Sequence, residues 1–357
     1  MTRPVRLAPN PVQHFYRGGG RIAALRGFAP VSDHQPEEWV AATVSRFGHA
    51  GAGLALTEDG TALRDLVAAD PEGWLGPWPA ATPRVSASDT GLLLKLLDAG
   101  QRLPVHVHPD RDFAVRHLDC PYGKTEAWFV IEADADAAVH LGWREDVDPL
   151  ELAQRRDVQD SEWMLSRMNR VPVRAGDGIL VPAGQVHAIG EGVFLAEAQE
   201  PTDYSIVLEW SVTTSDREDS HLGVGFPVAM KAVSHRALPP AELAALCRRV
   251  EPGTTAPVPQ RCLPEAADPF FRMHVLAPDA GQDGGTAGPV PAGFAALVVL
   301  DGEGTVRSDR DTIAVCEGDL IAVPAGFGPW SVEGPVRLIA ARPGAAWPAD
   351  LRFSPRG

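Results

Sequence analysis

Short segments in which apolar and polar residues alternate run through most of this 357-residue chain, and glycines and prolines separate them. Residues 125–131, which read TEAWFVI, and residues 100–108, which read GQRLPVHVH, are two examples. Alternation with a period of two is typical of β-strands, and many short strands between turn residues favour barrels or sandwiches. The pattern therefore predicts a mainly β protein, and the length suggests two domains.

Helical signals are few. In residues 148–151, an Asp in the N-cap position precedes a Pro and an acidic residue, which predicts a short helix, and residues 161–167 can form a second one. Together they predict a helical insertion around residues 146–170. Residues 239–250 predict a linking helix, and residues 278–293, rich in Gly, Ala, Asp and Pro, predict an exposed loop.

Four residues are candidate metal ligands. His106 and His108 are two positions apart on a predicted strand, so both imidazoles are expected on the same side of a sheet. Glu126 lies in the alternating segment 125–131, and His187 follows a Pro-Ala-Gly turn. An exposed His pair and a loop His are the plain alternative, but the four residues together predict one divalent metal site.

The spacing of these residues resembles the paired signature of the cupin superfamily, whose small antiparallel barrel holds a metal. Five residues separate Gly100 from His-x-His, and five residues separate Gly176 from Pro-x-Gly-x-x-His. Glu126 lies eighteen residues beyond His108, so residues 109–124 are expected to form an excursion that returns to the barrel.

Longer motifs narrow the resemblance. The segments HPDRDFA (108–114), GKTEAWF (123–129), NRVPVRAGD (169–177) and VPAGQVHAIG (181–190) are similar to those of type I mannose-6-phosphate isomerases. The resemblance extends from about residue 92 to residue 203. It implies a zinc-dependent bicupin that interconverts an aldose and a ketose. Manganese, iron and nickel also accept imidazole and carboxylate ligands.

Two positions depart from the family pattern. His106 replaces a Gln, which keeps a metal ligand, and Val207 stands where the family has an active-site Arg. A phosphate is best held by an Arg fork, or by Lys with backbone amides, and the next basic residue is Arg217. Mannose 6-phosphate is the leading expected substrate, and a free aldose is the alternative.

The C-terminal part repeats the turn of the first barrel. Residues 316–329 match residues 175–187 almost position for position, with Pro329 in the place of His187. This internal repeat predicts a second cupin without metal ligands. The predicted organisation is a metal-binding cupin domain over residues 1–215, a helical linker over 216–255 and a C-terminal cupin over 256–357.

Catalytic candidates follow from these positions. Lys124, two residues before Glu126, is expected to transfer a proton or to bind a substrate oxyanion. Lys95 is a second candidate for substrate binding, and Glu197, Glu200 and Asp203 are candidate acid–base groups. The expected reaction moves a proton between C1 and C2 through a cis-enediol, with the metal as Lewis acid, and a hydride shift is the alternative.

The amino-acid composition limits which binding partners are expected. The formal net charge of −15 argues against binding to nucleic acid, because no basic stripe is present. The four cysteines lack CxxC spacing, and no stretch resembles a signal peptide or a membrane span. We therefore expect a cytoplasmic enzyme with a small sugar or sugar phosphate as its partner.

Two other function classes stay open. Three His and one Glu also serve in cupins that use oxygen or decarboxylate their substrates, and oxygen consumption would separate these from an isomerase. A sugar-binding bicupin without catalysis is the other class, and Val207 in the Arg position favours it. Turnover of a panel of aldoses would separate it from an enzyme.

Overall fold

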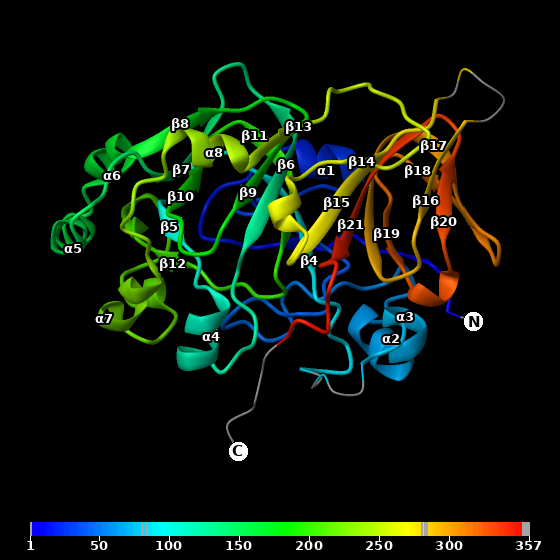
Figure 1. Ribbon diagram of the computed structural model, residues 1–357, viewed down its shortest axis with the longest axis horizontal. Coiled ribbons are helices and arrows are strands. Elements are labelled where there is room, and N and C mark those ends of the chain that lie inside the picture. The colour runs from blue at the N-terminus through cyan, green and yellow to red at the C-terminus, as the bar shows by residue number, and fades with distance from the viewer. Residues whose placement is uncertain (1, 80–81, 83–84, 280, 282–284, 352–357) are drawn as a thin grey trace.

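The computed structural model describes residues 2–79, 82, 85–279, 281 and 285–351 and has three antiparallel sheets (Figure 1). The seven-stranded sheet has the order β13-β9-β6-β11-β4-β3-β2. Its strands are β2 (Pro11–Val12), β3 (Glu37–Val40), β4 (Leu93–Asp98), β6 (Glu126–Ala133), β9 (Asp177–Val181), β11 (Val193–Gln199) and β13 (Cys247–Arg249). The mainly β prediction is confirmed.

The five-stranded sheet has the order β12-β5-β10-β7-β8. Its strands are β5 (His106–Val107), β7 (Ala138–Trp143), β8 (Met168–Pro172), β10 (His187–Ile189) and β12 (Ile206–Val207). The predicted strand over residues 100–108 is thus much shorter, because only residues 106–107 pair with β10 and β12.

The nine-stranded sheet contains the C-terminal strands and the N-terminal β1, which pairs with β19. Its strands are β1 (Val5–Arg6), β14 (Gln260–Arg261), β15 (Phe271–Leu276), β16 (Thr286–Val290), β17 (Ala295–Ser308), β18 (Thr312–Cys316), β19 (Leu320–Val323), β20 (Trp330–Glu333) and β21 (Val336–Pro343). The first residues of the chain therefore extend the C-terminal sheet. Our division at residues 215 and 255 stays a prediction.

The seven-stranded sheet lies between the other two and is buried on both faces. Leu96 and Ala196 belong to the core shared with the C-terminal sheet, whereas Leu97 and Leu195 belong to the core shared with the five-stranded sheet. Successive side chains of a strand point to opposite faces. Lys95 and Glu197, two positions from Leu97 and Leu195, therefore face the five-stranded sheet that carries the histidines.

Helices lie at the edges of the sheets (Figure 1). They are α1 (Arg21–Arg26), α2 (Leu63–Ala69), α3 (Pro71–Leu75), α4 (Arg111–His117), α5 (Pro149–Asp157), α6 (Ser161–Arg167), α7 (Phe226–Ala229) and α8 (Pro240–Ala245). Single 3-10 turns occur at Trp210–Val212, Asp219–His221, Met230–Ala232, Glu265–Ala267 and Ala325–Phe327. No helix in the described ranges is both long and apolar enough to cross a bilayer.

Several local predictions can be compared with these elements. Helix α5 begins at Pro149, and the Asp148 side chain accepts hydrogen bonds from the next backbone amides, as the capping pattern predicted. The predicted helix over 239–250 is shorter, because residues 247–249 form β13 on the edge of β9. The predicted loop over 278–293 is wrong for residues 286–290, which form β16; residues 280 and 282–284 lie outside the described residues.

The internal repeat appears as the same turn in two sheets. Gly176 and Gly318 both have φ near +85° (89° and 84°), and a Cβ there would collide with a carbonyl oxygen, of Val250 and Leu25 respectively. Glycine is therefore required at both positions. Strands β9 and β19 follow these glycines, which supports the two-cupin interpretation.

Candidate metal and sugar site

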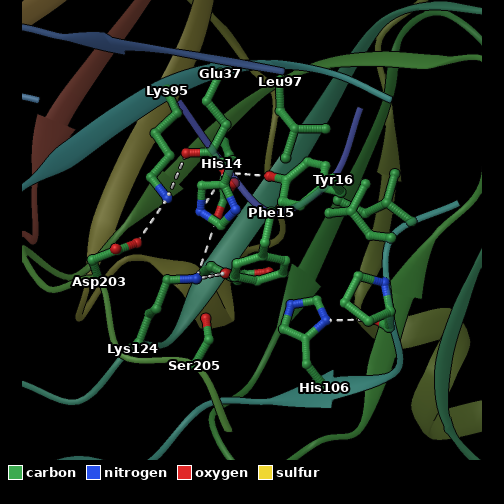
Figure 2. Close-up of a pocket in the computed structure, with 15 residues that line it drawn as sticks. His14, Phe15, Tyr16, Glu37, Lys95, Leu97, His106, Lys124, Asp203 and Ser205 are labelled. Atoms are coloured by element: carbon green, nitrogen blue, oxygen red, sulfur yellow. Dashed lines mark hydrogen bonds and ion pairs between the residues drawn. The ribbon is translucent and has the colours of Figure 1, made fainter. Parts of the chain in front are cut away.

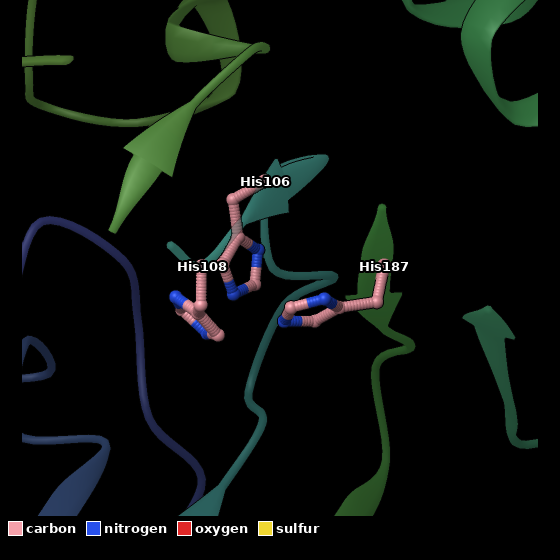
Figure 3. A group of neighbouring side chains, drawn as sticks. All are labelled: His106, His108 and His187. Carbon is pink, nitrogen blue, oxygen red and sulfur yellow. The ribbon is translucent and has the colours of Figure 1, made fainter. Parts of the chain in front are cut away.

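Three histidines from two paired strands point toward one another (Figure 3). His106 lies opposite His187 in the antiparallel pair of β5 and β10, and His108 follows two residues after His106. One nitrogen from each ring lies within 4.8 Å of the others, and all three residues are buried. The predicted convergence of these imidazoles is therefore present in the fold.

Backbone carbonyl groups orient the three rings. Each Nδ1 lies 2.7–2.8 Å from a carbonyl oxygen, that of Pro104 for His106, Tyr204 for His108 and Gln185 for His187. A carbonyl oxygen can only accept a hydrogen bond, so each Nδ1 carries the proton and each Nε2 keeps its lone pair. This arrangement prepares three Nε2 atoms to bind a metal ion.

Burial keeps the imidazoles of His106 and His108 neutral. It lowers the pKa of His108 to about 3 and the pKa of His106 well below its ordinary value. Nε2 of His187 is buried and accepts no hydrogen bond. Buried lone pairs without a donor are costly unless a cation satisfies them, so these residues fit one metal ion.

Glu126, the first residue of β6, lies beside the histidines. Its carboxylate oxygens are 2.9 Å from Nε2 of His108 and 3.3 Å from Nε2 of His187. Burial alone would raise its pKa, but the ammonium of Lys124, 2.7 Å away, and the neighbouring histidines hold the pKa well below the usual range. Glu126 is therefore an anionic group at the centre of the site.

Lys124 is buried rather than exposed at a strand edge. Its Nζ donates to Nε2 of His108 at 2.8 Å and to Oε2 of Glu126, and it lies 3.5 Å from Oε1 of Glu197. Burial and the charge of Glu126 raise the pKa of Glu197 to about 8. Lys124 and Glu197 thus form a proton-bearing pair next to the imidazoles.

A second buried lysine lies farther along the same face of the seven-stranded sheet (Figure 2). Lys95 on β4 is 3.3 Å from Glu37 and 3.4 Å from Asp203, and its Nζ lies 4.9 Å from the Trp39 ring centroid. Although burial opposes it, these carboxylates and Glu197 raise the pKa of Lys95. Its ammonium is therefore permanently charged and already paired.

The N-terminal segment supplies one wall of the pocket. His14, Phe15, Tyr16 and Glu37 line it together with the metal-site residues (Figure 2). Tyr16 donates its hydroxyl proton to Glu37, and Nε2 of His14 lies 3.7 Å from the same carboxylate. Burial lowers the pKa of His14 to about 4, so this ring is neutral.

A larger hollow of about 550 Å³ adjoins this pocket and shares four lining residues with it, namely His14, Phe15, Asp203 and Ser205. Val207 lines the larger hollow, and on β12 it pairs with His106. Arg46 and His49, from a loop after β3, line it as well. A ligand on the metal site can therefore extend toward Val207.

Comparison with known proteins places this arrangement in a family. The family described as "Mannose-6-phosphate isomerase, cupin domain" matches residues 290–343. A mannose-6-phosphate isomerase of Streptococcus mutans is 30% identical over 257 residues, which cover 70% of this chain and 73% of the relative. This chain belongs to the mannose-6-phosphate isomerase family. The family predicted from the motifs is confirmed.

Other members show the same fold and a similar sequence. The mannose-6-phosphate isomerase ManA of Bacillus subtilis is 28% identical over 250 residues, covering 70% of this chain and 74% of the relative. A crystal structure of a B. subtilis mannose 6-phosphate isomerase superposes with a TM-score of 0.68 at 22% identity, covering 96% of this chain and all of the other. Mutant phosphomannose isomerases of Salmonella typhimurium give TM-scores up to 0.69 at 15–16% identity. The fold of these isomerases thus extends over nearly the whole chain.

The predicted site residues of this family member fall into two groups. Lys95, Lys124, Glu197 and Asp203 line the pocket next to the metal-site residues. Glu200 does not: its carboxylate binds Arg111 at 2.5 Å and the Thr125 amide at 3.0 Å, away from the pocket lining. Both carboxylate oxygens of Glu200 are thus engaged outside the pocket lining, and its catalytic role stays a prediction.

Sequence reasoning missed the N-terminal wall. The available signal was the acidic pair Glu37-Glu38 at the start of an apolar strand, since buried carboxylates need partners. Glu38 binds Arg26, but Glu37 faces the pocket and binds Tyr16 and Lys95. His14 carried no distinctive motif, and only the fold shows that it reaches the site.

Proposed function

We propose that this protein is a metal-dependent aldose–ketose isomerase that interconverts mannose 6-phosphate and fructose 6-phosphate. The names of its relatives support this substrate. The observation that carries the proposal is that three buried imidazoles point to one place, beside a buried carboxylate and a buried lysine. This set can bind a sugar's oxygen atoms and move a proton next to them.

In this proposal the metal is zinc, held by His106, His108, Glu126 and His187. Imidazole and carboxylate donors suit zinc, and manganese, iron and nickel accept the same set. When bound, the metal supplies Lewis acidity to the carbonyl and the adjacent hydroxyl oxygen of the substrate. The carbonyl contacts at the Nδ1 atoms keep the imidazoles oriented for this role.

The proton transfer is assigned to Lys124 and Glu197. Nζ of Lys124 and Oε1 of Glu197 lie 3.5 Å apart, within the pocket that His106 also lines. One of them removes the proton from C2 of the aldose, which leaves an enediolate. A proton passes from O2 to O1, and the first proton returns to C1 to form the ketose. Because both groups are buried, the proton is exchanged within the pair more readily than with bulk water.

Lys95 and Asp203 are assigned to substrate binding. Their 3.4 Å ion pair lies on the opposite side of the pocket from His106 (Figure 2). A charged pair of this kind offers donors and acceptors to the hydroxyl groups of a sugar chain, and so positions C1 and C2 near Glu197.

The test is isomerisation of mannose 6-phosphate by protein loaded with zinc, followed in D₂O. We expect fructose 6-phosphate to form, to carry some deuterium at C1, and to require the metal. Absence of turnover with zinc, manganese, iron and nickel would refute the proposal. Turnover without any deuterium in product or recovered substrate would favour the hydride shift over the enediol.

We further propose that the protein works in the cytoplasm, which its four free cysteines support. The proposed organisation keeps the metal in the first cupin, residues 1–215, followed by the linker 216–255 and the second cupin 256–357. Limited proteolysis within the linker, followed by metal analysis of the separated parts, checks this division.

A further inference from the structure

The hollow next to the metal pocket is large enough for the distal end of a substrate. Its volume of about 550 Å³ is within the range of small-molecule sites, and it shares Asp203 and Ser205 with the pocket. A hexose bound through its C1 and C2 oxygens near His106 would extend its C6 end toward Val207, which pairs with His106. The charge and polarity of the residues that line this hollow therefore decide which group at C6 is accepted.

The charges around the hollow do not favour a phosphate. Its basic residues are Arg46, the exposed His49 and the neutral His14, whereas Asp203, Glu218 and Asp219 contribute carboxylates. Nη1 of Arg46 already donates to the Gln13 carbonyl at 2.9 Å. A phosphate dianion there would gain one partly engaged guanidinium and face the carboxylate of Asp219. The carboxylates of Asp203 and Glu218 are also present, paired with Lys95 and Arg217 respectively.

The two lysines of the adjoining pocket do not provide a free cation either. Lys95 contacts Glu37 and Asp203, and Lys124 contacts Glu126 and Glu197. Each ammonium is therefore already paired with at least one carboxylate. An anion that displaced one of them would leave a buried carboxylate without its partner.

The remaining lining suits a neutral polyol. Phe15, Phe47, Val207 and Leu222 present apolar surface, and hydroxyl groups come from side chains at Ser205, Thr214 and Ser215. Apolar walls with a few hydroxyl groups can pack on the carbon face of a sugar and hydrogen-bond its hydroxyls.

From this lining we infer that the site accepts an unphosphorylated aldohexose such as mannose almost as well as its 6-phosphate, within about tenfold in kcat/KM. This inference rests on the proposed isomerase function and specifies its substrate class. Val207, Glu218 and Asp219 are the residues that remove the advantage of a phosphate. Each charged hydrogen bond to a phosphate is worth about tenfold or more in affinity, so a site without such hydrogen bonds can be recognised by its low preference for the phosphate ester.

The experiment compares kcat/KM of the zinc-loaded protein for mannose and for mannose 6-phosphate. We expect the phosphate ester to be favoured by less than about tenfold, the value of a single charged contact. A larger preference for the ester would overturn the inference and leave the proposed isomerase intact. Turnover of neither sugar would refute the proposed function, and the inference with it.

Two variants test the assigned residues. Val207→Arg, and separately Glu218→Gln with Asp219→Asn, should each raise the preference for the phosphate ester, because they add a cation or remove carboxylates. The matched control, Asp301→Asn with Glu303→Gln, removes the same charge from exposed positions on β17 and should leave the preference unchanged. An unchanged preference in both test variants would show that C6 does not reach this hollow and would overturn the assignment.

Discussion

The ammonium of Lys124 donates a hydrogen bond to Nε2 of His108 over 2.8 Å. The same nitrogen is the one that a metal ion would use, because Nδ1 of His108 is engaged by the Tyr204 carbonyl. Metal binding and this hydrogen bond therefore exclude each other. When a metal binds, Lys124 loses its contact with His108 and keeps two buried partners, Glu126 and, at 3.5 Å, Glu197.

This relationship leads to a prediction for Lys124→Met. We expect zinc affinity to be equal to or higher than that of the parent, because the competing ammonium is gone. Turnover should fall by ~100-fold to ~10,000-fold, the usual value of acid–base help. Calorimetric zinc titration and steady-state kinetics measure the two effects. Activity within a few fold of the parent would remove Lys124 from proton transfer and leave the role to Glu197 or Asp203.

The metal content itself is a second prediction. We expect one equivalent of divalent metal per chain, because Pro329 of the C-terminal repeat stands in the place of His187. The double variant His108→Ala/His187→Ala should lose the metal, whereas His274→Ala, on β15 of the other sheet, should retain it. Elemental analysis after dialysis checks this. About two equivalents in the parent, or retention in the double variant, would contradict a single site.

The stability of the pocket depends on Lys95, which gives a third prediction. Lys95→Met leaves the buried carboxylates of Glu37 and Asp203 without their shared cation, and we expect a loss of about 3–5 kcal/mol in the free energy of unfolding. Adding Glu37→Gln should restore part of this loss by removing one of the two charges. Urea unfolding of both variants tests it. Equal destabilisation in the single and double variants would mean that lost packing, not charge, is responsible.

The sequence predicted the parts of this site that are formed by residues close together along the chain. His106 and His108 are two residues apart and lie beside β10, so strand periodicity and the cupin spacing were enough to bring them to His187. Lys124 and Glu126 were predicted in the same way. The burial of Lys124 was not predicted, because its partner Glu197 comes from a different strand. The signals within one strand or one turn were therefore reliable.

Contacts between distant segments were not predictable in this way. His14 and Arg46 reach the site only through the path of the N-terminal segment along β3, and neither lies in a motif. Glu200 is the first residue after β11, the strand that contains Glu197, and beyond the strand the alternation of faces ends. Its side chain therefore turns to Arg111.

The last prediction concerns pH and His14. Burial lowers the pKa of folded His14 to about 4, whereas an unfolded chain has the ordinary value of 6.5. Between these values the unfolded state binds the extra proton, so stability falls as the pH decreases from about 6.5 toward 4. For this shift the loss in the free energy of unfolding is about 2–3 kcal/mol.

We expect His14→Asn to lose less stability than the parent over this interval, measured by urea unfolding of metal-free protein at pH 7 and pH 4.5. Parallel curves for the two proteins would show that His14 is already protonated in the fold, paired with Glu37 at 3.7 Å.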